Sequence, residues 1–199
     1  FVRNGANLQG EAKEKYRALC KELSLLTLQF SENNLKETND YKLVITDKSQ
    51  LAGLPESAVE AAAETAGEKG VEGWVFTLQA PSYGPFLTYA DSRDLRRELY
   101  MAYNTKCTHD NASNNLEIVK KLANVRMEIA QLLGYDNFAE YNLQERMAQN
   151  SESVYKLLDQ LLEAYTPTAK QEYAEVQALA RQAEGENFVL MPWDWAYYS

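Results

Sequence analysis

His109 is the only histidine in the chain, so it is the first residue to weigh for chemistry. Zinc sites and nucleophile–base pairs commonly need at least one imidazole on a rigid element. His109 instead lies in a polar, turn-like segment, TKCTHDNASNN, beside Asp110 and close to Cys107. Neighbouring side chains on such a segment do not keep the fixed geometry of a metal ligand set or a reactive Cys–His pair. The sequence therefore predicts no catalytic residue and no metal ligand.

Charged side chains are numerous, but their positions indicate a solvated surface. Most carboxylates fall on the polar faces of expected helices, and no spacing singles out the pair that a carboxylate-based hydrolase would need. Arg93, Arg96 and Arg97 could bind an anion, yet Asp91 and Asp94 are interleaved with them, so we expect local ion pairing. The formal net charge of −9 argues against a nucleic-acid partner.

The remaining candidate site is aromatic. Tyr83, Phe86 and Tyr89 lie around a Gly-Pro pair, and we expect an ordered aromatic corner, because large rings held together bury their faces. Core packing is the interpretation that we favour for this corner. The alternative is that Tyr83, Phe86 and Tyr89 form part of a substrate-channel wall.

The element that positions these aromatics is the stretch 73–103, around which the rest of the chain is organised. Its first part alternates with the period of two that is typical of a strand, here 73–78, and Asp91 is expected to cap a following helix. A second strand is expected at 41–46, with a helix that opens at Pro55 between the two. Such a βαβ-like unit favours a parallel pair of strands.

Helical spacing of apolar residues dominates the rest of the chain. The patterns predict helices over 11–30, 116–133 and 151–185, and a short helix capped by Asp136. Pro167 lies inside the last pattern and predicts either a kink or a new helix start. The expected fold class is mainly α, a multi-helix bundle with a small two-stranded β element.

The predicted domain organisation is a single helical fragment, 1–199, of a larger protein. Residues 1–110 supply one helix and the β element, and 111–199 continue the helices around one core. The chain begins at Phe1 and ends in PWDWAYYS, and the crowded aromatics of that tail imply a partner surface elsewhere. No apolar run reaches the roughly 18 residues that cross a bilayer, so we expect no membrane partner. The compartment, cytoplasmic or periplasmic, stays open.

Several motifs in a consistent order resemble one known family. They are FVRNGANL, LAGLPESAVEAAAETA running into GWVFTLQAPSYGPFLTYADSRDLRRELYMAY, RMEIAQLLGYDNFAEYNLQERMA, and the closing PWDWAYYS. Together they resemble the zinc-dependent oligopeptidases, the family of thimet oligopeptidase, oligopeptidase A and peptidyl-dipeptidase. The resemblance covers essentially the whole chain.

The resemblance implies a mostly helical metallopeptidase with two lobes around a narrow channel that admits short peptides. It also implies a zinc ion held by a His-Glu-x-x-His helix and a downstream Glu, with the Glu of the motif as general base. This chain has no such motif, and one histidine cannot supply two imidazole ligands. We therefore expect a non-catalytic segment without cofactor, inactive alone, whose full-length protein binds zinc in a missing catalytic lobe beyond Ser199.

Two functions from different classes follow from these observations. The first is a segment that gives helical scaffold, and possible channel wall, to a peptidase whose partners are short peptides and the missing lobe. The alternative is a stand-alone helical protein-interaction module that docks a partner through its apolar tail. A longer reading frame with His-Glu-x-x-His would decide for the peptidase. The cleavage mode, endopeptidase or removal of C-terminal dipeptides, does not follow from these residues.

Overall fold

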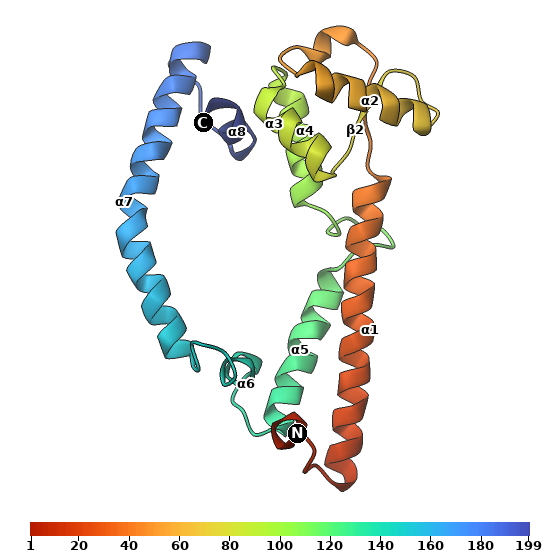
Figure 1. Cartoon of the computed structure of the whole chain (residues 1–199), viewed down its shortest axis with the longest axis vertical. Coiled ribbons are helices and arrows are strands. Elements are labelled where there is room, and N and C mark those ends of the chain that lie inside the picture. Colours follow the sequence, from red (N-terminus) through yellow and green to blue (C-terminus); the bar gives the residue numbers. More distant parts are fainter. The chain divides into compact units, whose positions relative to one another are not determined.

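The computed structural model describes every residue from Phe1 to Ser199 (Figure 1). Helices α1 to α8 and one two-stranded sheet make up the regular structure, which confirms the mainly α class with a small β element. Contacts divide the chain into two compact units, the first made of 1–33 and 110–168, the second of 34–109 and 169–199. The expectation of one core throughout the chain stays a prediction.

The first unit is built on α1 (Gly10–Asp40), as far as residue 33, and on α5 (Leu116–Leu132), with α6 (Phe138–Leu143) beside them. Its buried cluster consists of Leu19 from α1 with Val125 and Ile129 from α5. These α5 residues are four apart, so they fall on one face of the helix and can meet a single partner.

Helix α1 runs ten residues beyond the predicted end at Phe30, to Asp40. Asn33 follows that predicted end, and asparagine side chains often bond to nearby backbone instead of continuing a helix. Here the Asn33 amide donates to the side chain of Asn115, at 2.8 Å, and Asn115 donates in turn to the carbonyl of Phe30, at 3.0 Å. A partner distant in sequence removes the competition with the backbone.

Two predicted helix caps are each one residue from the observed cap. Ser92, not Asp91, caps α4 (Arg93–Asn104), and Asn137, not Asp136, caps α6, its side chain accepting from the Glu140 N–H at 3.0 Å. Asp91 instead accepts a hydrogen bond from the hydroxyl of Tyr197, at 2.9 Å.

The sheet of the second unit joins β1 (Leu43–Ile45) to β2 (Trp74–Phe76), and α2 (Glu56–Glu68) lies between them in sequence. The strands are antiparallel, with Leu43 opposite Phe76, so the predicted parallel βαβ-like pairing is wrong. Just before β2, the backbone at Gly73 passes very close to the end of β1. At Gly73, φ is +99°, and a Cβ there would lie 2.2 Å from the Ile45 carbonyl oxygen.

The expected aromatic corner around the Gly-Pro pair is ordered as a helix, α3 (Ala80–Tyr89). Pro81 occupies its first turn, where a missing N–H costs nothing. Pro85 lies further inside and removes one intrahelical bond. Burial of the neighbouring side chains Phe86 and Leu87 offsets that loss.

The chain ends with α7 (Ser151–Glu184) and α8 (Trp195–Tyr198). Helix α7 is continuous through Pro167, which excludes the alternative of a new helix start there. In the second unit, Tyr173 of α7 stacks on Trp195, with ring centroids 6.3 Å apart.

Candidate functional site

The three predicted wall residues share α3 but lie in different surroundings. Phe86 is completely buried and meets Phe76 edge to face, with ring centroids 4.6 Å apart. Tyr83 is half-buried and stacks on Tyr103 at 4.4 Å, and burial raises the pKa of its hydroxyl to about 12. Tyr89 is 49% exposed. Core packing is therefore confirmed for Phe86, and Tyr89 is the one of the three that presents a large surface.

His109 and Cys107 do not form a reactive pair. The Nε2 atom of His109 lies 3.3 Å from the Thr105 hydroxyl, in an exposed position. Cys107 is buried, and that burial raises the pKa of its thiol, so the thiolate is disfavoured. No group of three or more His, Cys, Asp or Glu side chains could hold a metal ion. The donor set of this chain does not fit a catalytic zinc.

A buried ion cluster joins α4 to the closing aromatic segment. Asp194 has no exposed surface, and both of its oxygens accept hydrogen bonds from Arg93, the shortest at 2.7 Å. Arg96, 1% exposed, donates to Asp194 at 3.1 Å and to the Ala90 carbonyl at 2.7 Å. The predicted local pairing of these arginines with neighbouring acidic residues is wrong, because their partner is about a hundred residues away.

Two opposing effects act on the carboxyl of Asp194. Burial raises its pKa, but the hydrogen bonds from Arg93, the Met191 backbone N–H and Arg96 favour the charged form and outweigh burial. The pKa of Asp194 is therefore held below its ordinary value. The cluster is structural, since protein groups already donate hydrogen bonds to both carboxylate oxygens of Asp194.

The aromatic tail packs on its own chain around this cluster. The Arg96 guanidinium lies 4.0 Å from the ring centroid of Tyr197, and that of Arg93 lies 4.3 Å from the ring of Phe188. Trp193 meets Tyr100 at 6.3 Å. These contacts pack part of the tail on its own chain, but Trp195 stays 39% exposed, so the expectation of a partner surface for the tail stays a prediction.

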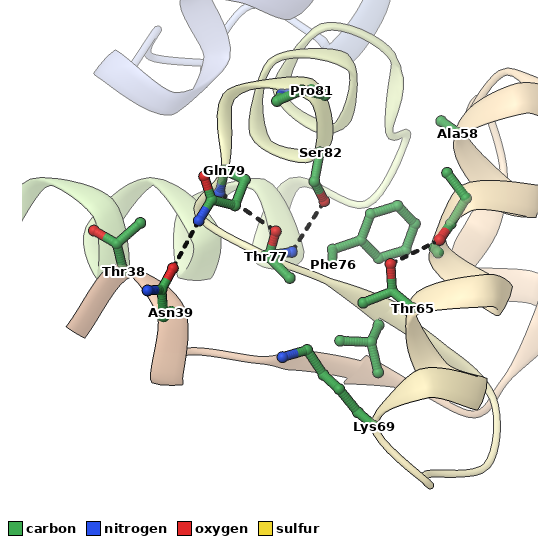
Figure 2. Close-up of a pocket in the computed structure, with 13 residues that line it drawn as sticks. Thr38, Asn39, Ala58, Thr65, Lys69, Phe76, Thr77, Gln79, Pro81 and Ser82 are labelled. Atoms are coloured by element: carbon green, nitrogen blue, oxygen red, sulfur yellow. Dashed lines mark hydrogen bonds between the residues drawn. The ribbon is translucent and has the colours of Figure 1, made fainter. Parts of the chain in front are cut away.

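A pocket of about 450 Å³ opens between α2, β2, the end of α1 and the start of α3 (Figure 2). Its apolar lining consists of Ala58, Ala61, Ala62, Val75, Phe76 and Pro81. Small alanine side chains on one face of α2 leave the space that larger residues would fill. Lys69 is the only charged residue of the lining.

Polar groups surround the apolar part of the pocket, and several already bond to one another (Figure 2). The Gln79 amide donates to the side-chain oxygen of Asn39, at 2.8 Å. The Thr77 backbone N–H donates to the Ser82 hydroxyl, at 2.9 Å. Thr65 turns its hydroxyl back to the Ala61 carbonyl, at 2.8 Å. These bonds hold the polar rim in place.

A protein-family model matches the C-terminal part of the chain. The model of Peptidase family M3 matches residues 86–199, more than half of the chain. This chain belongs to peptidase family M3. The match covers α4, α5, α7 and the Arg93–Asp194 pair, whereas the lining of the pocket precedes it.

Curated M3 relatives align with the chain over its full length. Oligopeptidase A of Haemophilus influenzae is 36% identical over 203 residues, and oligopeptidase A of Escherichia coli is 37% identical over 203 residues. The dipeptidyl carboxypeptidase of Escherichia coli is 32% identical over 200 residues. Each alignment covers 100% of this chain, but only 29–30% of the relative.

The M3 resemblance was visible in the sequence, but two features of the structure were not. The sequence contains one signal of the pocket, the recurrence of alanine at 58, 61 and 62 on one face of α2. The ion cluster left another, a single acidic residue among the aromatics of PWDWAYY. No helix of the chain combines the length and the apolar character that a membrane span needs.

Proposed function

We propose that this M3 chain is a non-catalytic segment of an oligopeptidase and supplies helical scaffold to an enzyme that hydrolyses short peptides. One observation carries the proposal: the chain belongs to a peptidase family, yet its side chains offer no metal-binding group. Its relatives bear the names oligopeptidase A and dipeptidyl carboxypeptidase, which supports peptide as the substrate class. It spans about 30% of the length of those relatives.

Zinc chemistry in this proposal belongs to residues outside the 199. A catalytic zinc site has three protein ligands and one open position, and hydrolysis also needs a general base close to the metal. His109 is the only imidazole, and it lies exposed beside Thr105. The zinc ligands and the base therefore come from the catalytic lobe of the full-length peptidase.

The first half of α7 supports the presence of such a lobe. Four large side chains recur there at steps of three and four, and each is more than half exposed, namely Tyr155 at 65%, Leu158 at 51%, Leu162 at 68% and Tyr165 at 66%. A helix face with this much exposed apolar surface marks an interaction site. We assign this α7 face to contact with the remainder of the peptidase.

Helix α3 is the proposed contribution to the channel wall. Tyr89 offers its exposed ring, Tyr83 contributes a half-buried ring, and Phe86 fixes the helix to the core from behind. An exposed aromatic ring on a fixed helix can stack on an apolar or aromatic side chain of a peptide.

The test of the non-catalytic role uses the purified 199-residue chain, excess zinc and a short fluorogenic peptide. The proposal predicts no hydrolysis above background, and no stoichiometric zinc after dialysis. Zinc-dependent cleavage that a chelator abolishes would falsify it. A matched reaction with a full-length oligopeptidase A shows that the assay detects cleavage.

The wall assignment is tested in a full-length peptidase that carries this segment. Replacing Tyr89 by Ala should change kcat/KM or the preference among peptides, while the free energy of unfolding changes by less than about 0.5 kcal/mol, because the ring is half exposed. Unchanged kinetics would remove Tyr89 from the wall. Phe86→Leu is the control, since it alters packing behind the helix without changing its surface.

A further inference from the structure

The pocket between α2 and β2 has the features of a ligand site, independently of the proposed scaffold role. Its volume of about 450 Å³ lies within the range of about 300–1,000 Å³ that is typical of small-molecule pockets. Like most such pockets it combines an apolar wall with a few polar groups. All of the lining lies within the second unit of the chain.

The charge of the pocket lining indicates which class of ligand the pocket favours. Lys69 is the only charged lining residue, and no carboxylate lines the pocket, although the whole chain carries a net charge of −9. Lys69 is half-buried, and its side-chain ammonium group forms neither an ion pair nor a hydrogen bond with the protein. Figure 2 shows its amine directed along the pocket, toward the side where Thr77 and Asn39 lie. An ammonium group in this position favours an anion, which would supply charge-assisted hydrogen bonds.

The polar groups of the pocket rim indicate which functional groups the ligand carries. The side-chain amide of Asn39 uses only its oxygen, as acceptor from Gln79, so its N–H groups are open. Gln79 in turn keeps its side-chain oxygen open, and the Ser82 hydroxyl accepts from Thr77 but donates to no protein group. Open donors and one open acceptor match the C=O and N–H of an amide. A plain alkyl carboxylate would match only the donors and would leave the Gln79 side-chain oxygen without a partner in the ligand.

We propose that this pocket binds a short apolar ligand that carries both an amide and a free carboxylate, the chemistry of an N-acylated apolar dipeptide. Lys69 pairs with the carboxylate. Asn39 and Gln79 pair with the amide, and the apolar side chains lie against Ala61 and Phe76. The recognition is non-covalent and needs no metal.

The experiment titrates the 199-residue chain with N-acetyl-Leu-Phe as the free acid and, separately, as its C-terminal amide. Binding is followed by calorimetry and by the backbone amide signals of Thr77 and Gln79. We expect saturable binding that shifts both signals, with the acid about tenfold tighter than the amide, because a hydrogen bond to a charged group contributes about 1.5 kcal/mol or more.

Three variants test separately the charge of Lys69 and the space inside the pocket. Lys69→Gln should remove the preference for the acid, whereas Lys48→Gln, which changes the charge equally at an exposed position away from the pocket, should keep it. Ala61→Leu should abolish binding of both peptides, because the longer side chain takes up space in the pocket that Ala61 lines. Circular dichroism checks that each variant folds.

Several results would overturn the proposal. Absence of saturable binding would do so, as would equal affinity for acid and amide, or an undiminished preference for the acid in Lys69→Gln. Octanoate that binds as tightly as the dipeptide acid would show that the amide-matching rim plays no part. Zinc-dependent peptidase activity of the chain would contradict the proposed function but leave this inference standing.

Discussion

Helix α5 and the first half of α7 have similar sequence patterns but different surroundings. On α5, the apolar residues Ile118, Leu122, Val125 and Ile129 are all less than 9% exposed. On α7 between residues 151 and 168, Leu158 and Leu162 recur with the same spacing but are 51% and 68% exposed. Both helices carry apolar residues at this spacing, but only the α5 residues are buried.

The difference teaches what helical periodicity means. Apolar residues at steps of three and four predict that a helix has a partner, but they do not say that the partner belongs to the same chain. The partner of α5 is the face of α1 that carries Leu19. The α7 face has none of comparable extent here, which fits a chain that spans about 30% of its M3 relatives.

The largest expected effect extends this contrast from apolar to charged groups. Asp194→Asn should lower the free energy of unfolding by about 3–5 kcal/mol, because it leaves the guanidinium of Arg96 buried without its counter-ion. Urea denaturation followed by circular dichroism measures the loss. Glu117→Gln, at an exposed pair with Lys120, is the control and should leave the melting temperature unchanged. Equal behaviour of the two variants would show that burial does not distinguish them.

A cavity on the covered face of α5 should have the next largest effect. Ile129 is 3% exposed, so Ile129→Ala should destabilise the chain by about 2–5 kcal/mol through lost burial and an unfilled space. Thermal unfolding of the variant and the parent chain checks this. A loss under about 1 kcal/mol would mean that α1 and α5 do not pack as described.

Acid should weaken the ion cluster by a smaller amount. The pKa of Asp194 is lower in the folded chain than its ordinary value of 3.8, so its ionised form stabilises the fold. That contribution is complete well above the ordinary pKa and is lost as the pH falls through the folded value. The stability difference between the parent chain and Asp194→Asn should therefore shrink between about pH 6 and pH 3. A difference that is constant over this range would remove Asp194 as the titrating group.

The smallest expected effect lies on the uncovered face of α7. Leu162 is 68% exposed, so Leu162→Ala should change the free energy of unfolding of the isolated chain by less than about 0.5 kcal/mol. Chemical denaturation beside Ile129→Ala makes the comparison direct. A loss similar to that of Ile129→Ala would show that another part of this chain covers the α7 face.

Helix α5 could be predicted from the sequence as 116–133, because its buried face depends on helical spacing alone. Strand direction could not be predicted, since the antiparallel pairing of Leu43 with Phe76 joins residues far apart in sequence. The bond from Asn33 to Asn115 extended α1 beyond its predicted end, and it joins residues far apart in sequence.

For the candidate sites, too, what could be predicted depends on local sequence, and what could not depends on contacts between distant residues. The family could be predicted from ordered motifs, and the family model confirms it. The contact of Arg93 and Arg96 with Asp194 and the pocket around Lys69 were not predicted. Both bring together elements that are distant in sequence, so local spacing carries no direct signal of them.

Amide hydrogen exchange of the isolated chain tests most directly whether α7 lacks its partner here. Local opening is easiest where few apolar contacts hold a helix, and each segment reports its own opening. The account predicts strong protection of α5 and much faster exchange over residues 151–168 of α7, measured at low protein concentration to limit self-association. Equal protection of the two segments would contradict it, because the α7 face would then be covered within the chain itself.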